Sequence, residues 1–72
     1  MKLHNKTNAP ALYSITAPGA ADCGTIAPGG NEDLPFYNNE KSVRVYFAFN
    51  EGSPNIEAPG HSQVTVELKK GD

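Results

Sequence analysis

The 72-residue sequence lacks a second cysteine, a cluster of basic residues and a long hydrophobic run. Cys23 stands alone, which excludes a disulfide within the chain. The net charge is −2 and the longest basic run is the pair Lys69-Lys70, so the cationic surface typical of nucleic-acid binding is missing. The longest apolar run, Val45 to Phe49, is too short to span a membrane. We therefore expect neither a disulfide scaffold, nor a nucleic-acid-binding protein, nor a transmembrane protein.

The small size of the chain limits its core. A single domain over residues 1–72 is expected, and a chain this short buries only about 60% of the surface that it exposes when unfolded. Small domains without disulfides or metals often gain stability by association, so homo-oligomerisation is one expected form. The segment Met1 to Lys6 lacks the apolar core of a secretory signal peptide. We expect a chain that is cytoplasmic as synthesised, with release independent of such a peptide as the alternative.

Three copies of the tripeptide Ala-Pro-Gly, ending at Gly19, Gly29 and Gly60, indicate turns. Proline sets φ for the second position of a type II turn, and glycine supplies the positive φ of the third. We therefore expect positive φ at all three glycines. Proline and glycine also interrupt nearly every window in which a helix could form.

Alternation of apolar and polar residues indicates strands, most clearly over Val43 to Phe49 and Val64 to Leu68. Because short links join antiparallel neighbours, we expect an all-β fold, a small antiparallel β-sandwich of about seven short strands, with a small barrel as the alternative. The weaker strands are Lys2 to Asn5, Ala11 to Thr16, Asp22 to Ile26, Asp33 to Tyr37 and Asn55 to Glu57. The expected core is Tyr13, Ile15, Ile26, Leu34, Phe36, Val43, Val45, Phe47, Phe49, Ile56, Val64, Val66 and Leu68.

Residues with catalytic or metal-binding chemistry are few. Cys23, His4 and His61 carry suitable atoms for a metal or for a Cys/His nucleophile pair, but their spacing matches no ligand rule. A thiol before glycine is more often a packing residue, and a histidine after a turn is more often solvated. We therefore expect no catalytic residue, no metal ligand and no cofactor.

Two sets of polar residues each allow a functional and a structural interpretation. Asp22, Glu32 and Asp33 lie at the ends of an expected hairpin and would offer oxygen ligands to Ca²⁺, although solvated loop carboxylates are the favoured interpretation. Asn5-Lys6-Thr7 matches the glycosylation sequence. With no leader peptide expected, Asn5 and Thr7 are better explained as turn formers.

The strand from Val43 to Phe49 offers a candidate binding surface. Its apolar face leaves Arg44 and Tyr46 on the other side, and these residue types are enriched at interface hot spots. Tyr37 and Tyr13 would join them if their strands lie nearby, which would create an aromatic surface for sugar rings, a peptide or another copy of the chain. The alternative is that the tyrosines only cover a thin sheet.

The loops offer a second candidate surface because they are rich in amides. Turn conformations that tolerate asparagine explain most of these residues, and amides also suit hydrogen bonding to carbohydrate hydroxyls. The seven asparagines are Asn5, Asn8, Asn31, Asn38, Asn39, Asn50 and Asn55.

Three segments carry a family resemblance: Leu3 to Ile15, Gly24 to Gly30 and Val43 to Phe47. In them an asparagine and a hydroxyl residue precede a strand, an Ile-x-x-Gly turn follows, and an alternating strand comes later. This pattern resembles the openings of thaumatin-like proteins and of small bacterial β-sandwich proteins that include insecticidal and membrane-active members. The resemblance implies a β-sandwich that binds a surface, receptor or glycan, and it transfers no catalytic residue. The disulfide cysteines and the acidic cleft of thaumatin-like proteins are absent from this sequence.

These observations favour a non-enzymatic binding module, or a toxin-like or effector-like protein, that recognises a protein or glycan surface. The alternatives are a structural protein, such as a virion component, and an enzyme inhibitor. An enzyme is the third and least favoured class. A catalytic pocket usually holds about 300 Å³ or more, and a thin two-layer domain would enclose that volume only between subunits.

Overall fold

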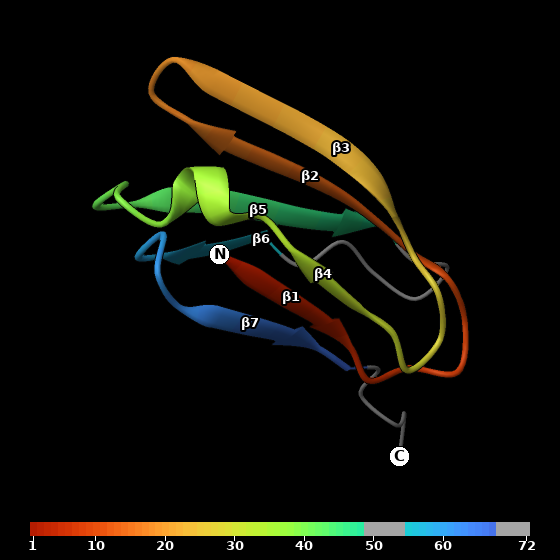
Figure 1. Cartoon of the computed structure of the whole chain (residues 1–72). Coiled ribbons are helices and arrows are strands. Elements are labelled where there is room, and N and C mark those ends of the chain that lie inside the picture. The colour runs from red at the N-terminus through yellow and green to blue at the C-terminus, as the bar shows by residue number, and fades with distance from the viewer. Residues whose placement is uncertain (49–54, 68–72) are drawn as a thin grey trace.

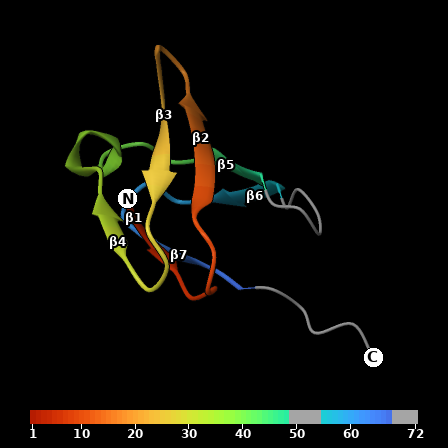
Figure 2. The same ribbon diagram turned by 90° about the vertical axis from the view of Figure 1, so that its right-hand side faces the viewer.

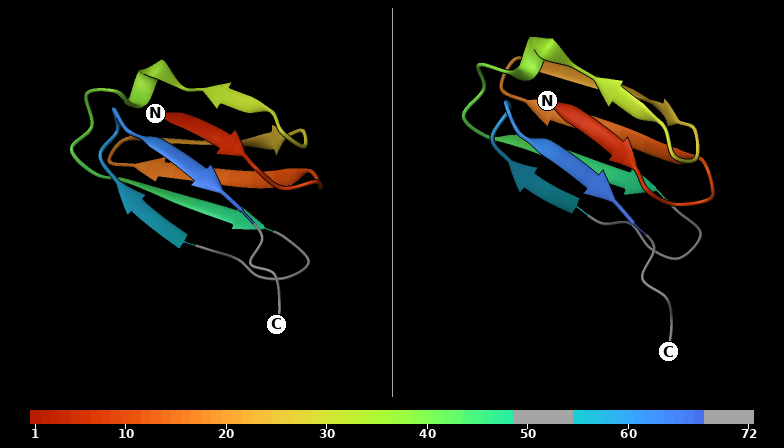
Figure 3. Two further views of the ribbon diagram at one scale, coloured as in Figure 1. Left: turned by 90° about the horizontal axis from the view of Figure 1, so that it is seen from below. Right: turned by 60° about the horizontal axis from the view of Figure 1, so that its bottom comes forward.

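The computed structural model describes residues 1–48 and 55–67 as a two-layer β-sandwich (Figure 1). Its elements are β1 (Lys2–Asn5), β2 (Ala11–Ala17), β3 (Ala20–Ile26), β4 (Asn31–Asp33), the 3-10 helix η1 (Pro35–Tyr37), β5 (Val43–Ala48), β6 (Asn55–Ala58) and β7 (Gln63–Val66). One sheet has the order β4-β1-β7 and the other β3-β2-β5-β6; Figure 3 shows them as two layers. The described strands do not close into a barrel, so the expected β-sandwich is confirmed.

One strand pair departs from the antiparallel pattern. β1 pairs with β7 in parallel, in a register that runs from Lys2 beside Gln63 to Asn5 beside Val66. The other four pairings are antiparallel. Short links force an antiparallel arrangement only on strands that follow each other in the sequence, whereas β1 and β7 are separated by nearly the whole described chain. The expectation of a wholly antiparallel sandwich is therefore wrong at this pair.

The expected strand from Asp33 to Tyr37 is also wrong. β4 ends at Asp33, and the chain then forms η1 with Pro35 as its first residue. Proline has no N–H for a strand ladder, and its fixed φ suits the first turn of a helix. As a result Phe36, expected in the core, is 74% exposed, while Tyr37 is fully buried.

The core lies between the two sheets and follows the alternation of their strands. In β2 every second residue is buried, and β5 behaves in the same way up to Phe47. Leu34 and Ile56 are only partly buried, and the expected core residues Phe49 and Leu68 lie outside the described residues. The buried apolar residues are Met1, Leu3, Ala11, Tyr13, Ile15, Ala17, Ile26, Tyr37, Val43, Val45, Phe47, Val64 and Val66.

A buried asparagine organises the link between β1 and β2. The Asn5 amide nitrogen donates to the carbonyl oxygens of Ala9 at 2.8 Å and Ile26 at 2.9 Å, while its side-chain oxygen accepts from the Thr7 N–H at 2.9 Å. Asn5 is completely buried, so the acceptor side chain of the glycosylation sequence is closed to solvent in the folded chain. The interpretation of Asn5 and Thr7 as turn formers is confirmed.

The three Ala-Pro-Gly turns are not equivalent. Gly19 and Gly29 have positive φ, 83° and 72°, as expected. Gly60 does not, so the expectation is wrong there. A Cβ on Gly60 would lie 1.7 Å from the carbonyl oxygen of Tyr37, so glycine is needed at this turn because two backbone segments meet closely.

Within residues 1–48 and 55–67, no helix has the length and apolar character needed to cross a membrane.

Candidate functional site

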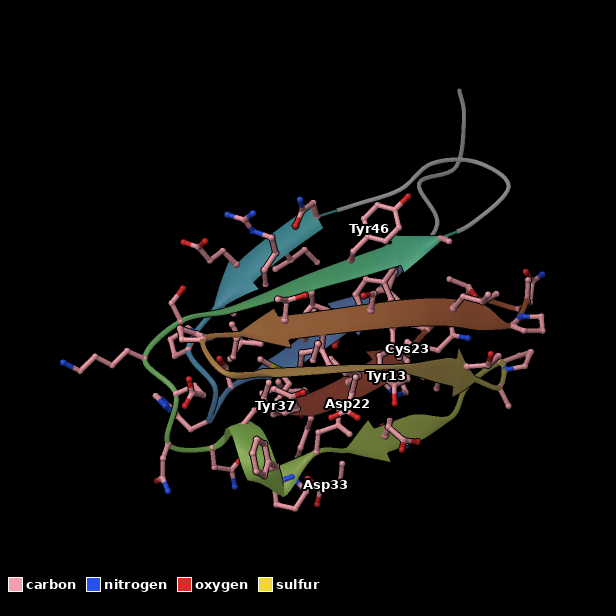
Figure 4. The ribbon with its side chains drawn as sticks, turned by 90° about the horizontal axis from the view of Figure 1, so that it is seen from above. Tyr13, Asp22, Cys23, Asp33, Tyr37 and Tyr46 are labelled. Atoms are coloured by element: carbon pink, nitrogen blue, oxygen red, sulfur yellow. The ribbon has the colours of Figure 1, made fainter. Side chains whose placement is uncertain are left out.

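The strongest candidate site is the outer face of the four-stranded sheet, which Figure 4 shows from above. The buried residues of β2 and β5 point to the other sheet, so the intervening side chains point outward. The strand register arranges them in three rows across the sheet. The rows are Thr25-Leu12-Ala48, Cys23-Ser14-Tyr46-Asn55 and Ala21-Thr16-Arg44-Glu57.

Two apolar side chains stand out on this outer face. Leu12 is 55% exposed and Tyr46 is 42% exposed. Leu12 lies opposite Ala48 and Tyr46 opposite Ser14, so the two large side chains are diagonal neighbours on adjacent strands. Diagonal neighbours are about 7–8 Å apart, within reach of a single ligand group. The expected outward placement of Tyr46 is confirmed.

One end of the outer face is charged. Arg44, which also points outward as expected, lies 3.4 Å from Glu57 on β6, and both side chains are nearly two-thirds exposed. An exposed pair of this kind stabilises the fold by at most about 1 kcal/mol, so the guanidinium can exchange its partner at little cost. An open depression of about 520 Å³ surrounds the pair, and it is lined by Thr16, Ala17, Pro18, Ser42, Arg44 and Glu57.

Tyr13 and Tyr37 do not belong to this face. Tyr13 is 7% exposed and Tyr37 is fully buried. Tyr13 lies opposite Phe47 and so shares its inward direction, and its ring passes so close to Gly24 that a Cβ there would lie 2.9 Å from it. The expectation that the three tyrosines form one exposed aromatic surface is therefore wrong.

Tyr13 and Tyr37 instead border a seam between β3 and η1. The Tyr37 hydroxyl donates to Asp22 at 2.7 Å, and Figure 4 shows the two side chains together. Burial, followed by this hydrogen bond, raises the pKa of Tyr37 to about 12. Burial also raises the pKa of Tyr13, with smaller effects from the charges of Glu32 and Asp22. Both hydroxyls remain protonated at neutral pH, so the Tyr37 hydroxyl can donate the hydrogen bond that connects η1 to β3.

The carboxylates considered for calcium do not converge. Asp22 lies on β3 of one sheet, whereas Glu32 and Asp33 are consecutive residues of β4 in the other. Consecutive strand residues point to opposite sides, and Figure 4 shows Asp33 apart from Asp22. Among the described residues, no group of three His, Cys, Asp or Glu side chains is placed to hold a metal ion.

The thiol and the two histidines are also separate. Cys23 is exposed and lies opposite Ser14 on the outer face of the four-stranded sheet. His4 lies on the other sheet, where its Nδ1 is 2.7 Å from the side-chain oxygen of Asn31. His61 follows Gly60 in the turn before β7.

The outer face of the three-stranded sheet has a different character. Lys2 lies between Asp33 and Gln63, and His4 lies between Asn31 and Thr65. A depression of about 360 Å³ here is lined only by polar side chains, those of Lys2, Asn31, Glu32, Asp33 and Gln63. Its described strands expose no large apolar residue. The two outer faces of the sandwich therefore differ sharply in polarity.

Sequence reasoning placed Arg44 and Tyr46 on this outer face but did not consider Leu12. The alternation in β2 contained this information. Its inward positions are Ala11, Tyr13, Ile15 and Ala17, which places Leu12 on the outer face. Comparison of the chain with known protein families, with characterised proteins and with solved structures gives no match.

Proposed function

We propose that this chain is a non-enzymatic binding protein that recognises a protein or glycan surface through the outer face of its four-stranded sheet. The observation that carries the proposal is the exposure of Leu12 and Tyr46 side by side on that face. Exposed large apolar side chains that cluster on one face are typical of interaction sites. The described strands of the other sheet have no such pair on their polar outer face.

The surroundings of Tyr46 suit a ligand with both apolar and polar groups. Its neighbours across the sheet, Ser14 and Asn55, supply a hydroxyl and an amide on either side of the ring. A tyrosine ring offers an apolar face to a sugar or an aliphatic side chain, and its hydroxyl adds a hydrogen-bonding group. Arg44, at one end of the face, would bind a carboxylate of the partner in place of Glu57. A toxin-like or effector-like role, as the resemblance implies, would use the same surface.

Binding measurements on matched variants test the proposal. The wild-type chain is screened on a glycan array and against a displayed peptide library, and each ligand found is measured again with Tyr46→Ala, Leu12→Ser and Thr65→Ala. Thr65 lies on the outer face of the other sheet and serves as the control. We expect Tyr46→Ala to weaken binding by about 30-fold or more, the effect of losing an interface anchor, while Thr65→Ala leaves it unchanged. Ligands that are insensitive to Tyr46→Ala and Leu12→Ser would contradict the proposal.

A further inference from the structure

The edge of the four-stranded sheet formed by β3 is long, and most of the residues of this strand are exposed. Figure 1 shows β3 along the border of the sheet, and Figure 2 shows the hairpin that it forms with β2. β3 has seven residues, whereas the other described edge strands, β4, β6 and β7, have three or four. It contains no proline, lysine or arginine, the residues that commonly block an edge.

The backbone groups that β3 turns outward can be identified from its hairpin. β2 and β3 are joined by the two residues Pro18-Gly19, so the flanking pair Ala17 and Ala20 is a hydrogen-bonded pair. Alternation then directs the N–H and C=O groups of Ala21, Cys23 and Thr25 away from β2. All three residues are exposed. Among the described residues, none of the backbone hydrogen bonds outside the strand ladders involves them.

We propose that this edge pairs with the β3 edge of a second copy of the chain, antiparallel and centred on Cys23. The two sheets then join into one continuous sheet about a two-fold axis, and the two copies of the outer face lie side by side. This inference concerns the edge and does not rest on the function proposed for the outer face.

The register follows from the outward groups and from the one charge on the strand. Centring on Cys23 places Ala21 of each copy opposite Thr25 of the other, so every outward residue meets another. It also places Asp22 opposite Gly24. Centring on Asp22 would set two carboxylates directly opposite each other, which is unfavourable. Centring on Gly24 leaves Ala21 without an outward partner on β3.

An exposed aromatic side chain beside the same edge supports a second copy as the occupant. The Phe36 ring is 74% exposed and lies in edge-to-face contact with Tyr37, at 5.4 Å between ring centroids. Tyr37 in turn is hydrogen-bonded to Asp22 on β3. The Tyr37 hydroxyl thereby connects η1 to β3, and a second copy that covers Phe36 as it pairs with this edge would remove apolar surface from water.

Sedimentation and crosslinking test the proposed pairing. Sedimentation equilibrium of the full chain from about 10 µM to about 1 mM should show a concentration-dependent rise toward twice the 7.7 kDa mass of the chain, as for a weak interface with a small buried area. A short bis-maleimide should link the two Cys23 thiols, because residues in a hydrogen-bonded antiparallel pair have Cα atoms about 5.5 Å apart.

Two variants provide the controls for register and edge. The double variant Cys23→Ser/Thr16→Cys moves the thiol from β3 to the neighbouring strand β2. In the proposed dimer the thiols of the two copies would then be about 14 Å or more apart, and crosslinking should be lost. Ala21→Pro removes an outward N–H without removing a bond to β2, so it should raise the dimer dissociation constant about tenfold or more while the far-ultraviolet circular dichroism stays that of the wild type. Leu12→Ser, which lies off the edge, should leave the dimer intact.

Three results would overturn the proposal. They are a monomer at every concentration, a dimer equally crosslinked through Thr16→Cys and Cys23, and a dimer that a folded Ala21→Pro chain forms as well as the wild type. The function proposed for the outer face fails by a different result, because it is tested by ligand binding to Tyr46→Ala and Leu12→Ser.

Discussion

At the scale of single residues, Gly60 shows that one turn motif serves two physical purposes. Gly19 and Gly29 are needed for positive φ, but the Gly60 position requires the absence of a side chain. The Gly60 N–H donates to the carbonyl oxygen of Glu40 at 2.9 Å, and the Glu40 N–H donates to the carbonyl oxygen of Tyr37 at 3.0 Å. These two backbone hydrogen bonds hold the two segments close together. The sequence predicted a turn at this tripeptide but neither the backbone conformation of Gly60 nor its neighbour, because that neighbour lies more than twenty residues away in the chain.

We predict that Gly60→Ala destabilises the fold far more than Gly19→Ala. A Cβ at Gly60 meets the Tyr37 carbonyl oxygen at 1.7 Å, so the backbone must move, whereas a Cβ at Gly19 meets nothing within 4 Å and only the positive φ is strained. We expect a loss of about 3 kcal/mol or more for Gly60→Ala and about 1 kcal/mol for Gly19→Ala. Urea unfolding of both variants measures the difference. Equal losses would show that the close approach is not present.

Tyr37 gives a prediction about alkaline pH. Its pKa is about 12 in the folded chain, against 10 for an unperturbed tyrosine. Because the folded pKa is raised, the stabilising effect of the protonated hydroxyl is complete below pH 10 and is lost as the pH rises from 10 to 12. The loss amounts to about 2–3 kcal/mol. Wild-type stability should therefore fall more steeply over this range than that of Tyr37→Phe.

Unfolding free energies of the wild type and of Tyr37→Phe from pH 8 to 12 test this prediction. If Tyr37→Phe also follows the wild-type slope, the pKa of Tyr37 is not raised in the folded chain.

At the scale of elements, the sequence predicted those features that depend on local alternation. The alternation of apolar and polar residues in β5 predicts that Arg44 and Tyr46 point outward, without any knowledge of the neighbouring strands. The structure agrees. The 3-10 helix was missed because Phe36-Tyr37 fits the composition of a strand, and only Pro35 argued against one. Which of these two aromatic residues is buried depends on the packing of η1 against β3, and this contact is not encoded in any local period.

We predict that Asn5 is a principal connection between elements. Its amide group bonds the link after β1 to the carbonyl of Ile26 at the end of β3, so one side chain ties together parts of both sheets. Asn5→Ala would leave the Ile26 and Ala9 carbonyls without this donor, at a cost of about 2–4 kcal/mol.

Asn8→Ala is the matched control for Asn5→Ala, because Asn8 is exposed in the same link. It should change stability by no more than about 0.5 kcal/mol. Thermal and urea unfolding compare the two variants, and similar losses for both would contradict the connecting role of Asn5.

At the scale of the whole molecule, the sandwich has one interior and two unlike exteriors. The three-stranded sheet presents Lys2, His4 and Gln63 to solvent, and the four-stranded sheet presents Leu12 and Tyr46. Both sheets contribute buried apolar residues to the core, and Leu12 and Tyr46 are not among them, so the requirement for a core does not explain the apolar residues outside. The sequence could not reveal this asymmetry, because it emerges only when the register sets side chains from four strands into common rows.

The two sides of β5 provide the most direct test of this arrangement. Tyr46 and Phe47 are consecutive aromatic residues, yet Tyr46 is 42% exposed and Phe47 is fully buried. Phe47→Ala should therefore cost about 3–5 kcal/mol, because it leaves a cavity between the sheets. Tyr46→Ala should change the unfolding free energy by no more than about 0.5 kcal/mol, since no second layer of the described chain covers it. Urea unfolding of the two variants decides the point: a loss at Tyr46 comparable to that at Phe47 would mean that the outer face is already covered in solution, and Tyr46 would then be a structural residue and not a binding one.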